Sequence, residues 1–188
     1  MLYLSKGVVQ PKSSIDNLCL ERGGKQYQLQ GMETAIWLKG RLGFADTESK
    51  AEEQAVKGLA DKGLAEMENR TDSISKYRIL TRCICCLAKR RRRMSSRLNE
   101  QEQQIYTWLQ KAGIYLSVAE LVFLQEHQIT ADNEIFGVRN RQKLIETIYT
   151  KDNIQDNLLE HQMEKAACRD EVVEALMQLL KKKKILIV

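Results

Sequence analysis

Five successive cations near the middle of the chain separate two stretches of opposite charge. Lys89 to Arg93 stand within residues 86–97, which hold six basic side chains and no acidic one. Residues 1–85 hold 13 basic and 11 acidic side chains, whereas residues 98–180 hold 7 basic and 14 acidic ones. Because the charge balance changes sign at this run, we predict a domain of residues 1–88, a basic linker or helix end of residues 89–97, and a domain of residues 98–188.

The composition is that of an ordinary folded protein. Hydrophobic residues make up 43% and charged residues 29% of the 188 residues, which excludes the disordered, collagen and coiled-coil classes. No apolar run approaches the roughly 18–20 residues that span a bilayer, and the N-terminus lacks the apolar stretch of a signal peptide. An odd number of cysteines, five, is typical of reduced thiols. We therefore expect a cytoplasmic protein with no membrane partner.

The first half opens with a predicted β-hairpin over residues 15–29. Its turn is Arg22-Gly23-Gly24-Lys25, and paired glycines supply the positive φ angles that tight hairpin turns need. A helix is predicted from Met32 to Lys39. A second helix is predicted after an N-cap at Asp46 or Thr47, with Lys62-Gly63 as its stop.

The rest of the first half is predicted as strands around a polar turn, followed by a helix. Residues 64–67 are expected to be extended, residues 69–73 to turn, and Tyr77 to Leu80 to return as a strand. Apolar residues at helical spacing then predict a helix over residues 81–94, whose last turns carry the arginines.

This order of elements resembles the winged-helix superfamily. The pattern Val56-x-x-Leu59-x-x-Lys62-Gly63-Leu64, followed by a polar turn and Tyr77 to Leu80, is similar to the last helix and the wing of winged-helix regulators, and the resemblance covers residues 31–82. The middle helix of that family is reduced here to about a turn near residues 41–44. The resemblance implies an α+β domain that binds DNA.

The second half is predicted to be mainly helical. A capping box joins Ser117 to Glu120. The expected helices cover residues 98–113, 117–126, 139–149, 154–166 and 169–180, and a strand is expected over residues 183–188. When the sequence is aligned with itself at a shift of 121 residues, Ala51 and Leu59 match Val172 and Leu180, which is a weak internal similarity between the two halves. The predicted fold class is therefore α+β, mainly helical, with a winged-helix-like N-terminal domain and either a helical C-terminal domain or a second, expanded winged helix.

No pattern in the chain indicates an enzyme. Cys83, Cys85 and Cys86 lack the second ligand pair and the spacing of structural zinc sites, so packing of small side chains is the favoured interpretation. His127 and His161 have no neighbouring partners arranged for catalysis, and the glycines form no phosphate-binding loop. We predict no catalytic residue, no metal site and no cofactor.

The candidate nucleic-acid-binding residues fall into three groups. Residues of the second helix are expected to reach base edges, wing residues to reach the DNA backbone, and the basic run to neutralise phosphates. A net charge of −1 on the second helix argues against insertion into the major groove, and a solvated linker is the alternative for the basic run. The three groups are, in order, Lys50, Gln54 and Lys57; Arg70, Lys76 and Arg78; and Lys89, Arg90, Arg91, Arg92 and Arg93.

Two functions remain open from the sequence. The first is a winged-helix transcriptional regulator that binds double-stranded DNA and forms a homodimer through residues 98–180. The second is an adaptor that binds a protein or peptide and no nucleic acid. For the second, Glu21 to Leu29 followed by Thr34 to Leu38 is similar to small winged-helix peptide-recognition elements. In that family, the strand before the helix offers its edge to a peptide.

Overall fold

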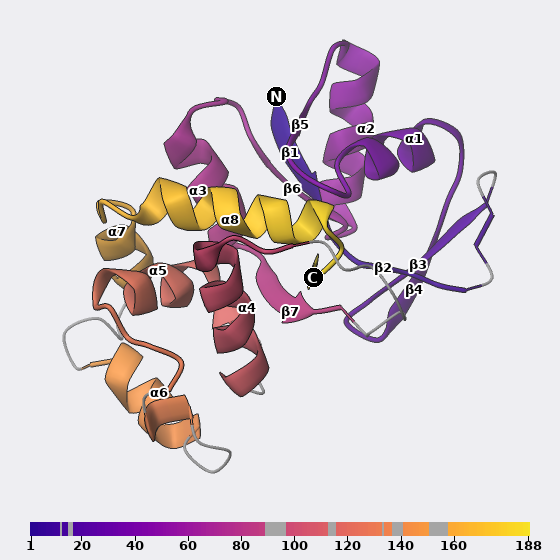
Figure 1. Cartoon of the computed structure of the whole chain (residues 1–188). Coiled ribbons are helices and arrows are strands. Elements are labelled where there is room, and N and C mark those ends of the chain that lie inside the picture. Colours follow the sequence, from indigo (N-terminus) through magenta and orange to yellow (C-terminus); the bar gives the residue numbers. More distant parts are fainter. Residues whose placement is uncertain are drawn as a thin grey trace. The chain divides into compact units, whose positions relative to one another are not determined.

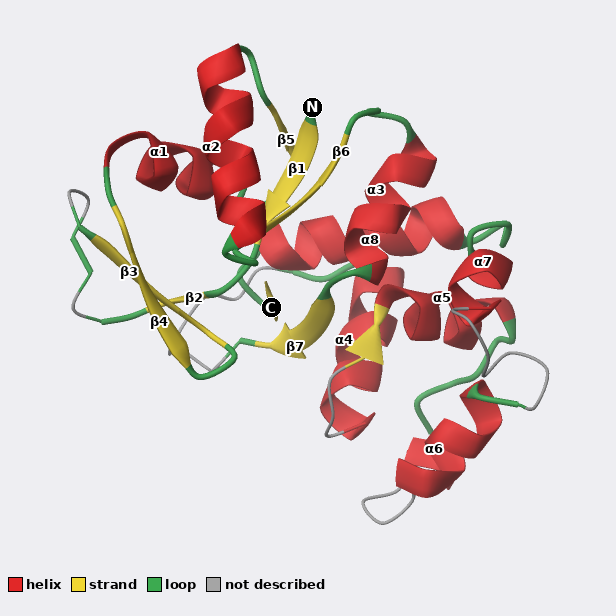
Figure 2. Cartoon of the chain, turned by 180° about the vertical axis from the view of Figure 1, so that it is seen from behind, coloured by secondary structure: helices red, strands yellow, loops and turns green. Residues whose placement is uncertain are grey.

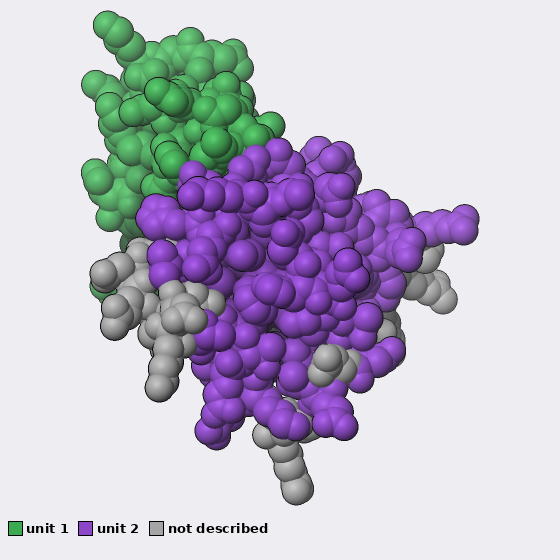
Figure 3. All heavy atoms as spheres, turned by 90° about the vertical axis from the view of Figure 1, so that its left-hand side faces the viewer, with its two compact units in different colours: residues 1–83, 186–188 green, residues 84–185 purple. Residues whose placement is uncertain are grey.

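The fold is α+β and consists of two compact units (Figures 1 and 3). A computed structural model describes residues 1–11, 13–14, 17–88, 97–112, 116–132, 134–136, 141–150 and 158–188. Unit 1 comprises residues 1–83 and 186–188, and unit 2 comprises residues 84–185. The chain therefore divides after Cys83, whereas the charge pattern predicts a boundary at residue 88.

The predicted hairpin in unit 1 is confirmed from Leu18 onward, and residues 15–16 of that prediction lie outside the described residues. Strands β3 (Leu18–Arg22) and β4 (Lys25–Leu29) pair antiparallel around Gly23 and Gly24, whose φ angles are 56° and 76°. Two positive φ angles in a two-residue turn define a type I′ hairpin, which glycine adopts without strain. The short strand β2 (Val8–Val9) pairs with the other side of β3, so the strand order is β2-β3-β4.

The two predicted helices follow. Helix α1 (Gly31–Lys39) begins directly after β4, and helix α2 (Lys50–Asp61) ends before Gly63, whose φ is 70°. The predicted N-cap of α2 at Asp46 or Thr47 is wrong, because Ala45 and Asp46 form strand β5. The cap is Ser49, whose Oγ accepts a hydrogen bond from the Glu52 N–H at 3.2 Å.

A second sheet uses the N-terminal strand, which the sequence analysis does not predict. Strand β1 (Leu2–Ser5) lies between β5 and β6 (Ala65–Glu68), and Tyr3 is opposite Met67 in the register. All four residues of β1 are buried. A strand covered on both faces shows no alternation of polar and apolar residues, which explains why the pattern gives no signal.

Helices cover both faces of the β5-β1-β6 sheet. On one face the Tyr3 hydroxyl donates to the Ile36 carbonyl of α1 at 3.1 Å. On the other face the Lys6 ammonium donates to the carbonyl of Arg82, which caps α3 (Ser73–Thr81), at 3.3 Å. Because successive side chains of an extended strand alternate between faces, α1 and α2 lie on one side of the sheet and α3 on the other (Figure 2).

The predicted strand over residues 77–80 is wrong, because these residues belong to α3. The Asp72 carboxylate accepts a hydrogen bond from the Ser75 N–H at 2.7 Å and so begins a helix. Tyr77, Ile79 and Leu80 are all buried in this helix. A hairpin after α2 therefore does not form, and β6 pairs with the N-terminal strand β1 instead.

The predicted helix over residues 81–94 is also wrong where the structure describes it. Residues Ile84–Leu87 form strand β7, in which Cys85 is buried and Ile84 is exposed. The exposed, β-branched Ile84 beside the buried Cys85 fits a strand, in which neighbouring side chains point to opposite faces. Residues 89–94 of that prediction lie outside the described residues.

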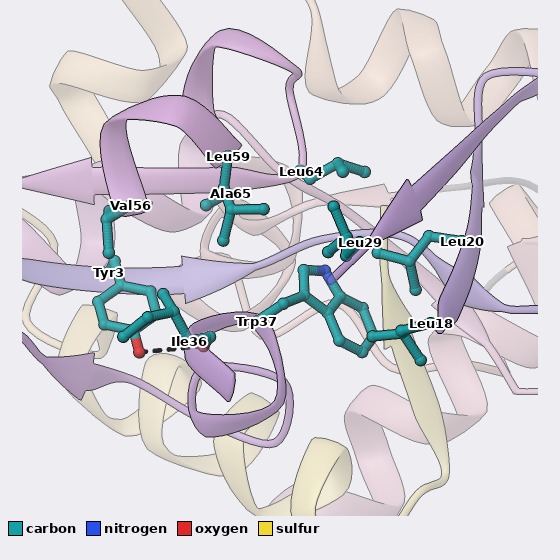
Figure 4. Close-up of a cluster of buried hydrophobic side chains, with 10 residues drawn as sticks. All are labelled: Tyr3, Leu18, Leu20, Leu29, Ile36, Trp37, Val56, Leu59, Leu64 and Ala65. Carbon is teal, nitrogen blue, oxygen red and sulfur yellow. Dashed lines mark hydrogen bonds between the residues drawn. The ribbon is translucent and has the colours of Figure 1, made fainter. Parts of the chain in front are cut away.

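The core of unit 1 joins both sheets and two helices (Figure 4). Trp37 of α1 is fully buried, and its indole N–H donates to the Lys6 carbonyl at 2.9 Å. A buried indole needs such an acceptor, so this bond fixes α1 to the end of β1. The other buried members of the cluster are Tyr3, Leu18, Leu20, Leu29, Ile36, Val56, Leu59, Leu64 and Ala65.

Among the described residues, unit 2 confirms the predicted helical character of the second half, and residues 113, 139–140 and 154–157 of the predicted helices lie outside them. The capping box is present, since the Ser117 Oγ accepts from the Glu120 N–H and the Glu120 carboxylate accepts from the Ser117 N–H. The three-stranded sheet has the order β8-β7-β9. The remaining elements of the second half are α4 (Glu100–Ala112), β8 (Leu116–Ser117), α5 (Val118–Glu126), η1 (Glu134–Phe136), α6 (Arg141–Ile148), α7 (Leu158–Met163), α8 (Arg169–Lys181) and β9 (Ile185–Ile187), whose last two residues belong to unit 1.

The ends of α2 and α8 share one local geometry. Gly63 and Lys183 both have positive φ, 70° and 55°. The N–H of Leu64 donates to the Leu59 carbonyl at 2.7 Å, and the N–H of Lys184 donates to the Leu179 carbonyl at 2.9 Å. Both helices therefore end in the same C-terminal motif, at an offset of 120 residues. The sheets β5-β1-β6 and β8-β7-β9 also share their order, with the earliest strand in the centre. The offset of 120 aligns Leu59 with Leu179, one residue away from the alignment with Leu180 that the internal sequence similarity gives.

Candidate functional surfaces

Three of the predicted nucleic-acid-binding residues lie together on α2. Lys50, Gln54 and Lys57 are all exposed, and their spacing of four and three residues places them on one helical face. This polar face is opposite to the buried Val56 and Leu59, which attach α2 to the core. The sequence pattern thus identified a real exposed face.

The three predicted wing residues lie elsewhere. Arg70 and Arg78 are exposed and Lys76 is half-buried, and the last two belong to α3. Because α3 covers the other face of the sheet from α2, the structure does not bring the two groups together. The Ser75 hydrogen bonds lower the pKa of Asp72, and the charges of Arg70 and Arg78 lower it further. Lys89, Arg90, Arg91, Arg92 and Arg93 lie outside the described residues.

The charges beside α1 and α2 are paired within unit 1. The Lys39 ammonium donates to the Glu48 carboxylate at 2.7 Å, and the Lys62 ammonium donates to the Glu33 carboxylate at 2.5 Å. The hydrogen bond from Lys39 lowers the pKa of Glu48, as expected for an ion pair. Since these pairs are solvent-exposed, they orient the helices more than they stabilise them.

A buried cation lies on the α3 side of the sheet. The Lys6 side chain is 1% exposed, and its ammonium is 2.5 Å from a Glu66 carboxylate oxygen. The second Glu66 oxygen is 3.6 Å from Arg82. Burial raises the pKa of the nearby Cys83 thiol to about 12, so this thiol is not a nucleophile at neutral pH. The cluster has the properties of a structural ion pair.

The part of the chain that the structure describes holds no metal-binding arrangement. Within it, no three His, Cys, Asp or Glu side chains lie close enough to hold a metal ion. Cys83 and Cys85 are buried, Cys86 is half-buried, and none of them is in a disulfide. Among the same residues, no helix combines the length and the apolar character needed to cross a membrane.

Strand β4 has an unpaired edge among the described strands. The Gln10 N–H donates to the Cys19 carbonyl, so the main chain of Cys19 faces β2. Leu18, Leu20 and Arg22 must therefore face β4, since main-chain groups alternate in direction along an antiparallel strand. Their partners are Leu29, Tyr27 and Lys25, and the main-chain N–H and C=O of Gln26 and Gln28 consequently point away from β3.

Helix α1, next to this edge in the chain, exposes apolar side chains. Met32 and Leu38 are 51% and 39% exposed, and Met32 follows the last residue of β4 by three positions. Ala35 is also exposed, so residues 32, 35 and 38 recur at intervals of three along α1. We call Gln26 and Gln28 of β4 together with this stripe the β4–α1 surface.

No sequence pattern assigns Gln26, Gln28, Met32 or Leu38 to a site. The sequence does contain a signal for the direction of the main-chain groups in β4. A two-residue turn makes the residues on either side of it a hydrogen-bonded pair, and this pair fixes which later N–H and C=O groups of the strand point toward β3 and which point away. Deciding that β4 is the outer strand requires the position of β2, which only the fold provides.

No family model, curated protein or solved structure matches this chain. The candidate surfaces therefore rest on their own geometry.

Proposed function

We propose that the protein is an adaptor that binds an extended segment of another protein at the β4–α1 surface. The unpaired edge of β4 is the observation that carries this proposal. An added strand would pair with the main-chain groups of Gln26 and Gln28, and its apolar side chains would find apolar partners in Met32 and Leu38.

The energetics favour a ligand that supplies both kinds of contact. Each main-chain hydrogen bond contributes a net stabilisation of about 0.5–1.5 kcal/mol, so a short strand alone binds weakly. Burial of apolar side chains adds about 25 cal/mol per Å² of area removed from water. The ligand is thus expected to be extended along β4 and apolar where it reaches α1.

Unit 1 is proposed as a variant winged helix in which the N-terminal strand takes the central place of the sheet. The order α1, β5, α2 and β6 supports this assignment. Because β6 pairs with β1, the chain makes no hairpin wing there. A domain without a wing has lost one of the two elements with which that family contacts DNA, and the adaptor function is therefore placed first.

The test uses a fluorescein-labelled nine-residue peptide of alternating Leu and Thr, with fluorescence anisotropy as the readout. We expect saturable binding that Gln28→Pro weakens by about two- to tenfold, because proline removes an outward N–H without removing a β3 bond. Gln28→Ala keeps that N–H and is the matched control, with unchanged binding expected. Equal affinities of the two variants would contradict the proposed site.

A second function is favoured by the exposed face of α2. Lys50, Gln54 and Lys57 present two cations and an amide in the arrangement that a major groove accepts. We propose weak DNA binding through this face, measured as a gel shift with a mixed 30-base-pair duplex at low salt. Lys57→Glu should abolish the shift, while Lys25→Glu, at the hairpin turn, should leave it unchanged. No shift for the parent chain would refute this function.

A further inference from the structure

We propose that the β4 edge pairs with the same edge of a second copy of the chain, around a twofold axis at Tyr27. The inference rests on the proposed function, since it names what occupies the β4–α1 surface when no ligand peptide is bound. It differs from the predicted homodimer through residues 98–180, because the contact lies wholly in unit 1.

The main-chain directions on β4 are self-complementary. In an antiparallel pair centred on Tyr27, Gln26 of one copy lies opposite Gln28 of the other, and both residues direct N–H and C=O outward. Each such pair makes two hydrogen bonds, and the symmetry provides two pairs. The twofold axis thus satisfies all four outward N–H and C=O groups of each copy, those of Gln26 and Gln28.

The side chains allow the same register. Lys25 of one copy lies opposite Leu29 of the other, so no like charges are directly opposed. The two Tyr27 rings meet at the centre, where a non-hydrogen-bonded pair brings side chains closest. Strand β4 contains no proline, its only charged residue is Lys25, and its register with β3 shows no bulge, so the usual devices that prevent edge pairing are confined to the turn.

Self-pairing would regulate ligand binding by competition. A dimer closed at β4 hides the outward groups of Gln26 and Gln28, so a peptide can add only to the dissociated chain. The apparent affinity for the peptide should then fall as the protein concentration rises above the dimer dissociation constant.

Sedimentation velocity of the full chain over a range of concentrations tests the dimer without any ligand. We expect a shift from the monomer mass of 21.7 kDa toward twice that value for the parent and for Gln28→Ala. Gln28→Pro should remain monomeric at the same concentrations. A parent chain that stays monomeric, or a Gln28→Pro chain that dimerises like the parent, would overturn the inference.

Cysteine cross-linking tests the register. Chains carrying Gln26→Cys and Gln28→Cys are prepared in a Cys19→Ser background, because Cys19 lies directly opposite Gln28 on β3. An oxidised equimolar mixture should form a cross-linked dimer, since hydrogen-bonded pairs have Cα atoms about 5.5 Å apart, within disulfide reach. Each chain alone should not cross-link above the background of the parent. Equal cross-linking of one chain with itself would refute the Tyr27 axis.

The two proposals fail separately. If the peptide binds but the parent is monomeric at every concentration, self-pairing is wrong and the adaptor function stands. If the parent dimerises, Gln28→Pro does not, and no peptide binds, self-pairing stands and the adaptor function is wrong.

Discussion

Replacing Gly63 by alanine is expected to destabilise unit 1 by about 2 kcal/mol. Gly63 follows α2 with a φ of 70°, a conformation that costs an L-residue about 1 kcal/mol or more. An added Cβ would also clash with the Nη1 atom of Arg22 and lie 3.1 Å from its Cζ. Because these atoms are the far end of a flexible side chain, the guanidinium can move aside, and the cost is limited to its place beside the negative C-terminal end of α2, up to about 1 kcal/mol.

Gly24 provides a matched control for the backbone contribution. Its φ of 76° is similar, but a Cβ there would meet nothing within 4 Å. Gly24→Ala should therefore cost only the backbone part, about 1 kcal/mol. A double variant, Arg22→Ala with Gly63→Ala, should separate the two terms, because the close contact requires the arginine side chain.

The assay is urea unfolding followed by tryptophan fluorescence in a Trp108→Phe background, since Trp37 is buried in the core of unit 1 and Trp108, in unit 2, is buried too. The free energy of unfolding is compared for the parent, the two alanine variants and the double variant. If Gly63→Ala costs no more than Gly24→Ala, the contact with Arg22 has no energetic consequence and the reasoning fails.

Three further predictions concern charge and thiols in unit 1. Glu66→Gln should reduce the free energy of unfolding by about 3 kcal/mol, because it leaves the buried Lys6 ammonium without a carboxylate, whereas Lys6→Met should cost less, because Glu66 keeps its second cation; urea unfolding of both variants checks this order. The folded-state pKa of Asp72 is lowered, so its stabilising contribution should be present above the unfolded pKa of about 3.9 and be lost as the pH falls through the folded pKa. The difference in the free energy of unfolding between the parent and Asp72→Asn should therefore shrink in acid. A difference that grows below about pH 4 would contradict the capping role. Iodoacetamide at pH 8 should modify the half-buried Cys86 well before Cys83, as measured by peptide mass spectrometry, because burial raises the pKa of Cys83 to about 12; equal rates would argue against a closed core at this position.

The candidate site residues show which features of a site the sequence pattern can predict and which it cannot. It correctly predicted that Lys50, Gln54 and Lys57 share an exposed face, because helical spacing alone decides which side chains are neighbours on a helix. It wrongly joined Lys76 and Arg78 to that face, since these residues lie on α3, behind the sheet. Which face of a sheet a segment covers depends on pairings between distant residues, and no local pattern contains that information.

Residues 77–80 show the same contrast between local sequence preference and tertiary packing within a single helix. Tyr77, Ile79 and Leu80 suit a strand by residue type, and the sequence predicts one. The Asp72 cap and burial on α3 make the segment a helix instead. Propensity is a weak preference, and the energy of packing against β6 and β1 is large enough to override it.

Structural features that depend only on residues close together in the chain can be predicted from the sequence alone. The Gly23-Gly24 turn, the Ser117–Glu120 capping box and the Gly63 helix end all form as their residue types require, because each depends on φ angles or hydrogen bonds within about five residues. The tertiary structure decided the place of β1 between β5 and β6, and with it the missing wing, and it separately placed β2 beside β3, which leaves β4 as the outer strand. The place of β1 follows from pairing residues more than 40 positions apart, such as Tyr3 with Ala45 and Met67, where burial of apolar area selects one partner among many.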